Sequence, residues 1–205
     1  MMQACAAFRH AARVAAVASL ATAAAAQEPS DGPGGRMLDH SGHTLDQSPS
    51  ALEEHGIVVD FELVDGAGNS VTDEDFRGRY LLLGFGFTHC AHICPLMAFN
   101  MGQVLSAADA SMAGIFVSVD TERDTPAVTN DYASHFGDGM IGLGGSIEQI
   151  NAAAKNFKVS YAITKTQDNY TVQHTANVFL IDPQGALVDV FNFTTAPEDI
   201  LAAIR

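Results

Sequence analysis

The sequence is poor in basic residues and in cysteine. Its 205 residues include 10 Lys and Arg against 24 Asp and Glu, which gives a formal net charge of −14. Nucleic acids and anionic membrane surfaces are bound through cationic patches, so this balance argues against both as partners. Only three cysteines are present, which excludes a scaffold held together by many disulfides. The chain is instead long enough to bury a hydrophobic core without them.

Long apolar runs are also missing. The longest, Val14 to Ala26, is shorter than the roughly 20 residues that a helix needs to cross a bilayer. Arg9 and Arg13 precede it, and three alanines end it. A basic start, a short apolar stretch and small residues at the end are typical of a secretory signal. Residues 1–26 are therefore predicted to be a signal peptide, with an uncleaved anchor as the alternative, and Cys5 would be removed with them.

The segment after the signal has no apolar periodicity. Residues 27–50 contain several prolines and the run DGPGG, so we interpret them as a flexible linker. Residues 51–205 are predicted to form one domain, without internal repeats. Met37, His40 and His43 of the linker are possible metal ligands, but solvated polar residues in a tail are the simpler interpretation, since short His-bearing tracts bind metals weakly without a scaffold.

Secondary-structure signals alternate along the predicted domain. A two-residue apolar period predicts a strand at Ile57 to Val64, and apolar residues on both faces predict a central strand at Tyr80 to Phe87. Two capping boxes are expected, at Ser146-x-x-Gln149 and Thr195-x-x-Glu198. The further expected elements are strands at 70–72, 114–119, 159–163, 176–181 and 186–193, a helical turn at 73–77, a short apolar segment at 141–143, and helices beginning near Pro95, Pro126, Ser146 and Thr195. This order predicts an α/β fold in which helices flank a mixed sheet.

A cluster of redox and metal-binding groups follows the predicted central strand. The stretch GFGFTHCAHICP contains two cysteines separated by three residues, with two histidines interleaved: His89, Cys90, His92 and Cys94. Free cysteines are often buried as small hydrophobic residues, but this set lies in a predicted loop, where functional groups concentrate. Proline is tolerated in the first helical turn, so Pro95 is predicted to open a helix. The N–H groups at that helix start would favour a thiolate at Cys94.

Three motifs occur in order: FTHCAHICP, SVDTERDTP and YTVQHTANVFLIDPQG. With them the sequence resembles the Sco/SenC/PrrC family over about residues 51–205. The resemblance implies a thioredoxin-like fold and an exported copper-binding protein, located in the periplasm or on the outer face of the cytoplasmic membrane. It also implies a role in assembling the dinuclear copper site of cytochrome c oxidase. The family's copper ligands fall on Cys90, Cys94 and His174.

The resemblance also suggests partners. The oxidase subunit that carries the dinuclear copper site is the expected recipient, and another periplasmic copper carrier or a thiol reductant is a further candidate. One departure lies within the first motif, where the family usually has Pro-Asp and this chain has Ala91-His92. We predict that His92 tunes the site without binding copper directly. The acidic residues of the second motif, Asp120 and Asp124, are retained.

Ligand chemistry agrees with the resemblance. Two thiolates and one imidazole suit copper in either oxidation state, and they differ from the four ligands of structural zinc. The first hypothesis is therefore a copper metallochaperone that has no catalytic residues. In it, a disulfide between Cys90 and Cys94 would block copper loading, because both sulfurs must be thiolates to bind metal.

The alternative hypothesis is an enzyme, a thiol-disulfide oxidoreductase that reduces the cysteines of a dedicated partner. General dithiol enzymes of the thioredoxin type carry a cis-proline before the strand that faces the active site, whereas this chain has Thr175 and Ala176 there. A peroxidase is excluded, because the peroxiredoxin pattern Pro-x-x-x-Thr-x-x-Cys fits neither Cys90 nor Cys94.

Overall fold

The computed structural model describes residues 56–108 and 112–204. The predicted signal peptide and linker, with His40 and His43, lie outside the described residues. Within the described ranges, no helix combines the length and apolar character that a membrane crossing requires.

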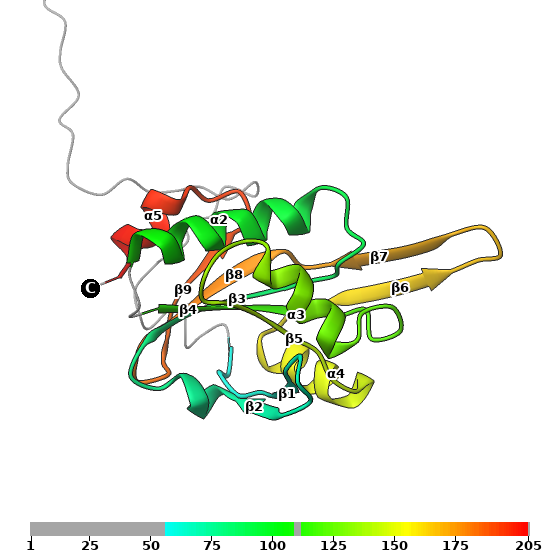
Figure 1. Cartoon of the computed structure of the whole chain (residues 1–205), viewed down its shortest axis with the longest axis horizontal. Coiled ribbons are helices and arrows are strands. Elements are labelled where there is room, and N and C mark those ends of the chain that lie inside the picture. Colours follow the sequence, from blue (N-terminus) through cyan, green and yellow to red (C-terminus); the bar gives the residue numbers. More distant parts are fainter. Residues whose placement is uncertain (1–55, 109–111, 205) are drawn as a thin grey trace, which may run out of the picture. The chain divides into compact units, whose positions relative to one another are not determined.

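A five-stranded mixed sheet forms the centre of the fold (Figure 1). Its strands are β3 (Tyr80–Gly86), β4 (Met112–Ser118), β5 (Met140–Leu143), β8 (Asn177–Ile181) and β9 (Leu187–Asn192), in the spatial order β5-β4-β3-β8-β9. β3, β4 and β5 run parallel, while β8 and β9 are antiparallel to their neighbours. All seven residues of β4 and six of the seven in β3 are buried. The predicted mixed sheet and the predicted central strand are therefore confirmed.

Helices cover both faces of this sheet (Figure 1). The helices α2 (Ile93–Ala108), α3 (Pro126–Ser134) and α5 (Pro197–Ala202) lie on one face, where Tyr132 of α3 packs on Phe116 with ring centroids 5.1 Å apart. The helix α4 (Ile147–Asn156) lies on the other face, where Phe157 at its end packs on Phe85 at 5.7 Å. A small hairpin of β1 (Glu62–Val64) and β2 (Ser70–Thr72), followed by the turn η1 (Asp73–Phe76), covers that second face beside α4.

Glycines in β3 let α2 approach the sheet closely. A Cβ on Gly86 would lie 2.7 Å from the Phe116 ring and 3.0 Å from Cys94 Sγ. At Gly84 it would lie 3.0 Å from Cε of Met97. Because larger residues would push the helix away, the pair of glycines in GFG brings the first turns of α2 down onto the strand.

A second hairpin lies apart from the central sheet. Its strands are β6 (Tyr161–Lys165) and β7 (Tyr170–His174), and it extends beyond the ends of the central strands (Figure 1). The sequence predicted a strand at 159–163 but no partner for it. The segment YTVQH was missed because only Val172 is an aliphatic residue there, and the half-buried faces of Tyr170 and His174 depend on tertiary contacts.

Several predicted boundaries differ from the structure, and three of them concern how an element begins. The first strand is paired only over 62–64, although burial alternates from residue 57 as the apolar period predicted. Helix α2 begins at Ile93, two residues before Pro95. Helix α5 has Ala196 as its N-cap residue, without a side-chain cap. Pro197 begins that helix, while the N–H of Thr195 donates to the Asn192 carbonyl in the preceding turn, so the expected capping box does not form.

Candidate metal centre

The predicted ligands come from three elements that meet at the carboxyl end of β3. Cys90 lies in the loop after β3, Cys94 in the first turn of α2, and His174 at the end of β7. Ligand sites of open α/β sheets commonly lie beyond the carboxyl ends of the strands. The structure thus brings together residues that are 80 positions apart in the chain.

Cys94 and His174 are in direct contact. Cys94 Sγ lies 3.3 Å from Nε2 of His174, and Nδ1 of His174 lies 3.0 Å from the Thr175 carbonyl oxygen. A carbonyl can only accept, so Nδ1 carries the proton and Nε2 presents a lone pair to the sulfur. Nε2 can therefore accept a hydrogen bond from the Cys94 thiol. A backbone carbonyl that fixes the tautomer in this way is the usual support of a metal-binding histidine.

Electrostatics at the imidazole favour its neutral form. Burial lowers the pKa of His174, and the hydrogen bond to Thr175 offsets part of that effect. The Phe87 ring packs on the His174 ring in an edge-to-face arrangement, with ring centroids 5.7 Å apart. A neutral imidazole in a fixed orientation is the form that binds metals.

The two cysteines differ in exposure and in acidity. Burial acts to raise the pKa of Cys90, but hydrogen bonds from the backbone N–H groups of Cys94 and His92 outweigh it and hold that pKa below the ordinary value. The N–H of Cys94 lies 3.4 Å from Cys90 Sγ. Burial raises the pKa of Cys94 strongly, and its hydrogen bond with Cys90 raises it further.

The prediction that Cys94 is the activated thiolate is therefore wrong. Cys94 is fully buried, and burial is the largest influence on the pKa of its thiol. The N–H groups at the helix start are directed at Cys90, which lies one turn earlier and is only partly buried. The helix start does favour a thiolate, but at the other cysteine.

A buried carboxylate fixes the loop that carries Cys90. Asp124 accepts hydrogen bonds from the Thr88 backbone N–H at 2.7 Å, the Thr88 hydroxyl at 2.6 Å and the Ser118 hydroxyl at 2.6 Å. Its side chain is fully buried, and His89 Nδ1 lies 3.4 Å from it. The loop after β3 is thus tied to the end of β4. Sequence reasoning noted Asp124 only as part of an acidic loop and did not predict this role.

The β7 strand is held by contacts with the loop after β4. The Tyr170 hydroxyl donates to Asp120 Oδ1 at 2.6 Å, and Arg123 Nε donates to the other oxygen of Asp120 at 2.5 Å. The guanidinium of Arg123 lies 3.9 Å from the centre of the Tyr170 ring and 6.0 Å from that of Phe87. Because Phe87 in turn contacts His174, a continuous set of side chains joins the hairpin to the candidate ligand.

Two further side chains belong to the surroundings of the centre: Tyr132, which was not predicted, and His92, which was predicted not to bind copper directly. The Tyr132 hydroxyl of α3 is buried and has no hydrogen-bond partner in the described part of the chain. Burial raises the pKa of Tyr132, and charge on Cys94 and Cys90 would raise it further. No pattern in the sequence marks this tyrosine. His92 is exposed, which fits the prediction that it is not a primary ligand without testing it.

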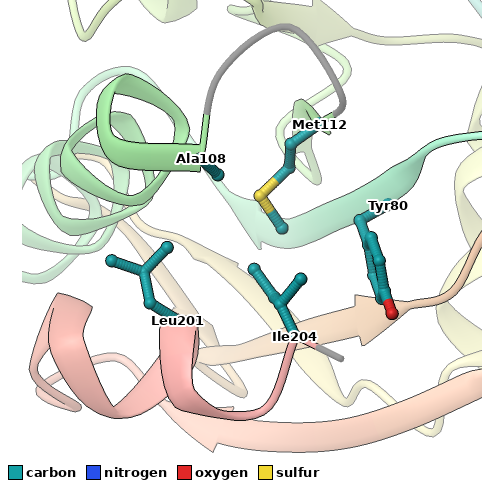
Figure 2. A pocket seen from close by; sticks show the side chains of 5 residues that line it. All are labelled: Tyr80, Ala108, Met112, Leu201 and Ile204. Carbon is teal, nitrogen blue, oxygen red and sulfur yellow. The ribbon is translucent and has the colours of Figure 1, made fainter.

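A small apolar cavity of about 150 Å³ lies at the opposite ends of β3 and α2 (Figure 2). Figure 2 shows the side chains that line it: Tyr80, Ala108, Met112, Leu201 and Ile204. Met112 is the only soft ligand among them, and neither a thiolate nor an imidazole is present. The thiol and imidazole groups gather instead at the carboxyl end of β3.

Comparison with known proteins identifies the family of this chain. The SCO1/SenC family matches residues 49–205. The chain is 35% identical over 153 residues to the mouse (Mus musculus) protein named SCO2 homolog, mitochondrial, covering 71% of this chain and 60% of that protein. It therefore spans less than two thirds of the length of that relative.

Solved structures give the same likeness. Bradyrhizobium japonicum ScoI, solved with copper bound, is 37% identical and superposes with a TM-score of 0.65 over 71% of this chain and 96% of its own. BsSco, described by its disulfide switch and as a member of the Sco family of cytochrome c oxidase assembly proteins, is 30% identical with a TM-score of 0.57 over 72% and 91% of the two chains. These likenesses confirm the predicted thioredoxin-like α/β fold. The chain belongs to the SCO1/SenC family.

Proposed function

We propose that this protein is an exported copper metallochaperone that binds one copper ion through Cys90, Cys94 and His174. The observation that carries the proposal is the 3.3 Å contact between Cys94 Sγ and the Nε2 lone pair of His174, with Nδ1 held by Thr175. Two sulfur ligands and one imidazole suit both Cu(I) and Cu(II). The copper-bound structure of ScoI, a relative in the same family, supports this choice of metal.

Copper binding would complete a set of ligands that is only partly assembled. Among the described residues, no three His, Cys, Asp or Glu side chains already surround one metal position. The central member is Cys94, which interacts with both Cys90 and His174. Binding would replace the proton of the Cys94 thiol, whose pKa is raised, and would draw the other two ligands toward the same ion.

The cargo, the recipient and the location are parts of the same proposal. We infer that the copper is passed to the cytochrome c oxidase subunit that carries the dinuclear copper site, since BsSco is described as belonging to a family of oxidase assembly proteins. Export to the periplasm, or to the outer face of the cytoplasmic membrane, is supported by the signal-like residues 1–26. Residues 27–50 would then be the linker to the copper-binding domain, 51–205.

Variant titrations test this function. We expect the reduced protein to bind one copper per chain, and Cys90→Ala or Cys94→Ala to abolish binding. His174→Ala should weaken Cu(II) more than Cu(I), because two thiolates nearly satisfy Cu(I). The measurements are copper content and the thiolate-to-Cu(II) absorption band. Full stoichiometry and an unchanged band in Cys90→Ala would refute the ligand assignment.

Thiol-disulfide exchange is the second candidate, and one observation favours it. The two cysteines are free, the partly exposed Cys90 has a lowered pKa, and the buried Cys94 has a raised one. An exposed attacking thiolate beside a buried second thiol is the arrangement that dithiol exchange requires. The disulfide switch described for BsSco is consistent with such chemistry. Loss of partner reduction in Cys90→Ser, with copper delivery unaffected, would favour this function over copper transfer.

A further inference from the structure

The first two turns of helix α2 are apolar on the side that faces solvent as well as on the side that faces the core, whereas the later turns expose Gln103 and Ser106. Its sixteen residues, ICPLMAFNMGQVLSAA, include no charged side chain. At about 3.6 residues per turn, Leu96 and Phe99 fall on the side opposite the buried Cys94 and Met101. A surface helix normally carries charged or polar residues on that side. The solvent side of the first two turns of α2 therefore differs from an ordinary helix surface.

Three large apolar side chains make up this stripe. Ile93 is 40% exposed, Leu96 43% and Phe99 53%, at intervals of three residues. Single exposed apolar residues are common on protein surfaces, but contiguous ones mark interaction sites. In the described part of the chain, half of the large exposed apolar residues belong to this one stripe; the others are Val58, Val128 and Ile147.

The stripe begins at the point where a metal would leave the centre. Cys94 is fully buried, whereas Cys90 is only partly buried and lies in the loop just before α2, so Cys90 is the cysteine that a second protein can reach. Direct transfer between proteins requires donor and acceptor ligands to bind the same ion at once. A protein that approaches Cys90 this closely must cover the first turns of α2.

We propose that Ile93, Leu96 and Phe99 form the docking surface for the protein that receives the copper, an acceptor whose own soft ligands lie within an apolar, uncharged surround. This inference rests on the proposed function. The absence of charge along α2 selects the chemistry of the acceptor, because a charged surface would lose its hydration against this stripe without gaining an ion pair. An interface of this kind is small, in the range below about 1,200 Å² that is typical of transient contacts.

The test is copper transfer from the full, Cu(I)-loaded chain to the copper-free, reduced soluble domain of the oxidase subunit that carries the dinuclear copper site. We expect the double variant Leu96→Ser with Phe99→Ser to transfer copper about tenfold more slowly, since a few buried residues carry most of the binding energy of an interface. The single variant Phe99→Leu, which keeps an apolar side chain and leaves Leu96 unchanged, should transfer copper faster than the double variant. Copper stoichiometry and extraction by a small Cu(I) chelator should stay unchanged, because the ligands are untouched.

Two variants on the other face of the sheet serve as matched controls. Val58 is 54% exposed and Ile147 41%, close to the values for Phe99 and Leu96. We expect Val58→Ser and Ile147→Ser to transfer copper at the wild-type rate. Equal slowing in all of these variants, or none in the Leu96 and Phe99 double variant, would overturn the docking surface.

Other outcomes are also decisive. If the wild-type chain is loaded with copper but transfers none to this domain, the named class of acceptor is wrong and the docking inference fails, while copper binding stands. If the wild-type chain binds no copper, the proposed function fails first. A wild-type dimer that the double variant dissociates, measured by sedimentation velocity, would assign the stripe to a second copy of this chain and would also overturn the inference.

Discussion

The two halves of the candidate centre are held in different ways. The cysteines lie on the central sheet and α2, with Cys94 fully buried and the Cys90 loop tied by the buried Asp124. His174 lies at the end of a separate hairpin. The far end of this hairpin is held by one hydrogen bond from Tyr170 to the buried Asp120 and by the surface ion pair of Lys165 with Glu122. Surface ion pairs contribute little to stability, whereas buried hydrogen bonds to a charge contribute more. We call the cysteine half, tied by three hydrogen bonds to a buried carboxylate, the fixed half, and the histidine half, which lies on a hairpin apart from the central sheet, the movable half.

The largest expected effect is on the fixed half. Asp124→Ala removes a buried acceptor and leaves the Thr88 N–H, the Thr88 hydroxyl and the Ser118 hydroxyl without it. We expect a loss of about 3 kcal/mol in the free energy of unfolding, measured by urea denaturation. Asp131→Ala, a change at an exposed aspartate of α3, is the control and should shift it by less than about 0.5 kcal/mol. Similar stability of the two variants would mean that the loop does not depend on Asp124.

A smaller loss is expected from filling the space under α2. Gly86→Ala places a methyl group 2.7 Å from the Phe116 ring and 3.0 Å from Cys94 Sγ, which should cost about 1–3 kcal/mol. It should also make the buried Cys94 react faster with an alkylating reagent. Gly84→Ala is the matched variant, because its nearest neighbours are the flexible ends of Met97 and Met101. If Gly84→Ala destabilises as much, the close approach at Gly86 has no special role.

The movable half should respond to a milder change. Tyr170→Phe removes the hydroxyl that donates to Asp120 at 2.6 Å but keeps the ring beneath Arg123. We expect a stability loss of about 1 kcal/mol and faster amide hydrogen exchange in β6 and β7 than in β3. Cu(II) binding should weaken several-fold and Cu(I) binding hardly at all. Ser70→Ala is the control, because it removes a side-chain hydrogen bond to Glu62 in the β1–β2 hairpin. Faster exchange in β3 would show that the two halves are not separate.

The smallest expected effect is a shift in an alkaline titration. Burial, together with the hydrogen bond to Asp120, raises the pKa of Tyr170 to about 12, above the ordinary value near 10. A raised pKa means that the contribution of this bond to stability is complete below about pH 10 and is lost as the pH rises toward 12. The difference between the ultraviolet titrations of the wild type and Tyr170→Phe should therefore show no ionisation below about pH 11. A difference titration centred near pH 10 would contradict the hydrogen bond between Tyr170 and Asp120.

The sequence predicted the fixed half well and the movable half poorly. Apolar residues on both faces identify β3 and β4, because burial of a central strand depends on local composition. The sequence predicted the thiolate at Cys94, whereas the structure lowers the pKa of Cys90 instead. This was missed because the helix begins two residues earlier than predicted. The partner strand β7 was missed because only Val172 is aliphatic there. The contacts of Tyr170 with Asp120 and Arg123 were missed because they join segments that are about 50 residues apart. His174 itself was found only through the family resemblance.

The most direct test of the central claim is an anaerobic copper titration of the same protein in two redox states. The free thiols Cys90 and Cys94 interact, so mild oxidation should join them, with a loss of two hydrogens confined to their peptide. Oxidation removes two of the three proposed ligands at once. We predict one copper per reduced chain, none in the oxidised chain at this centre, and full recovery after mild reduction. Stoichiometric copper uptake by the oxidised chain would contradict the account.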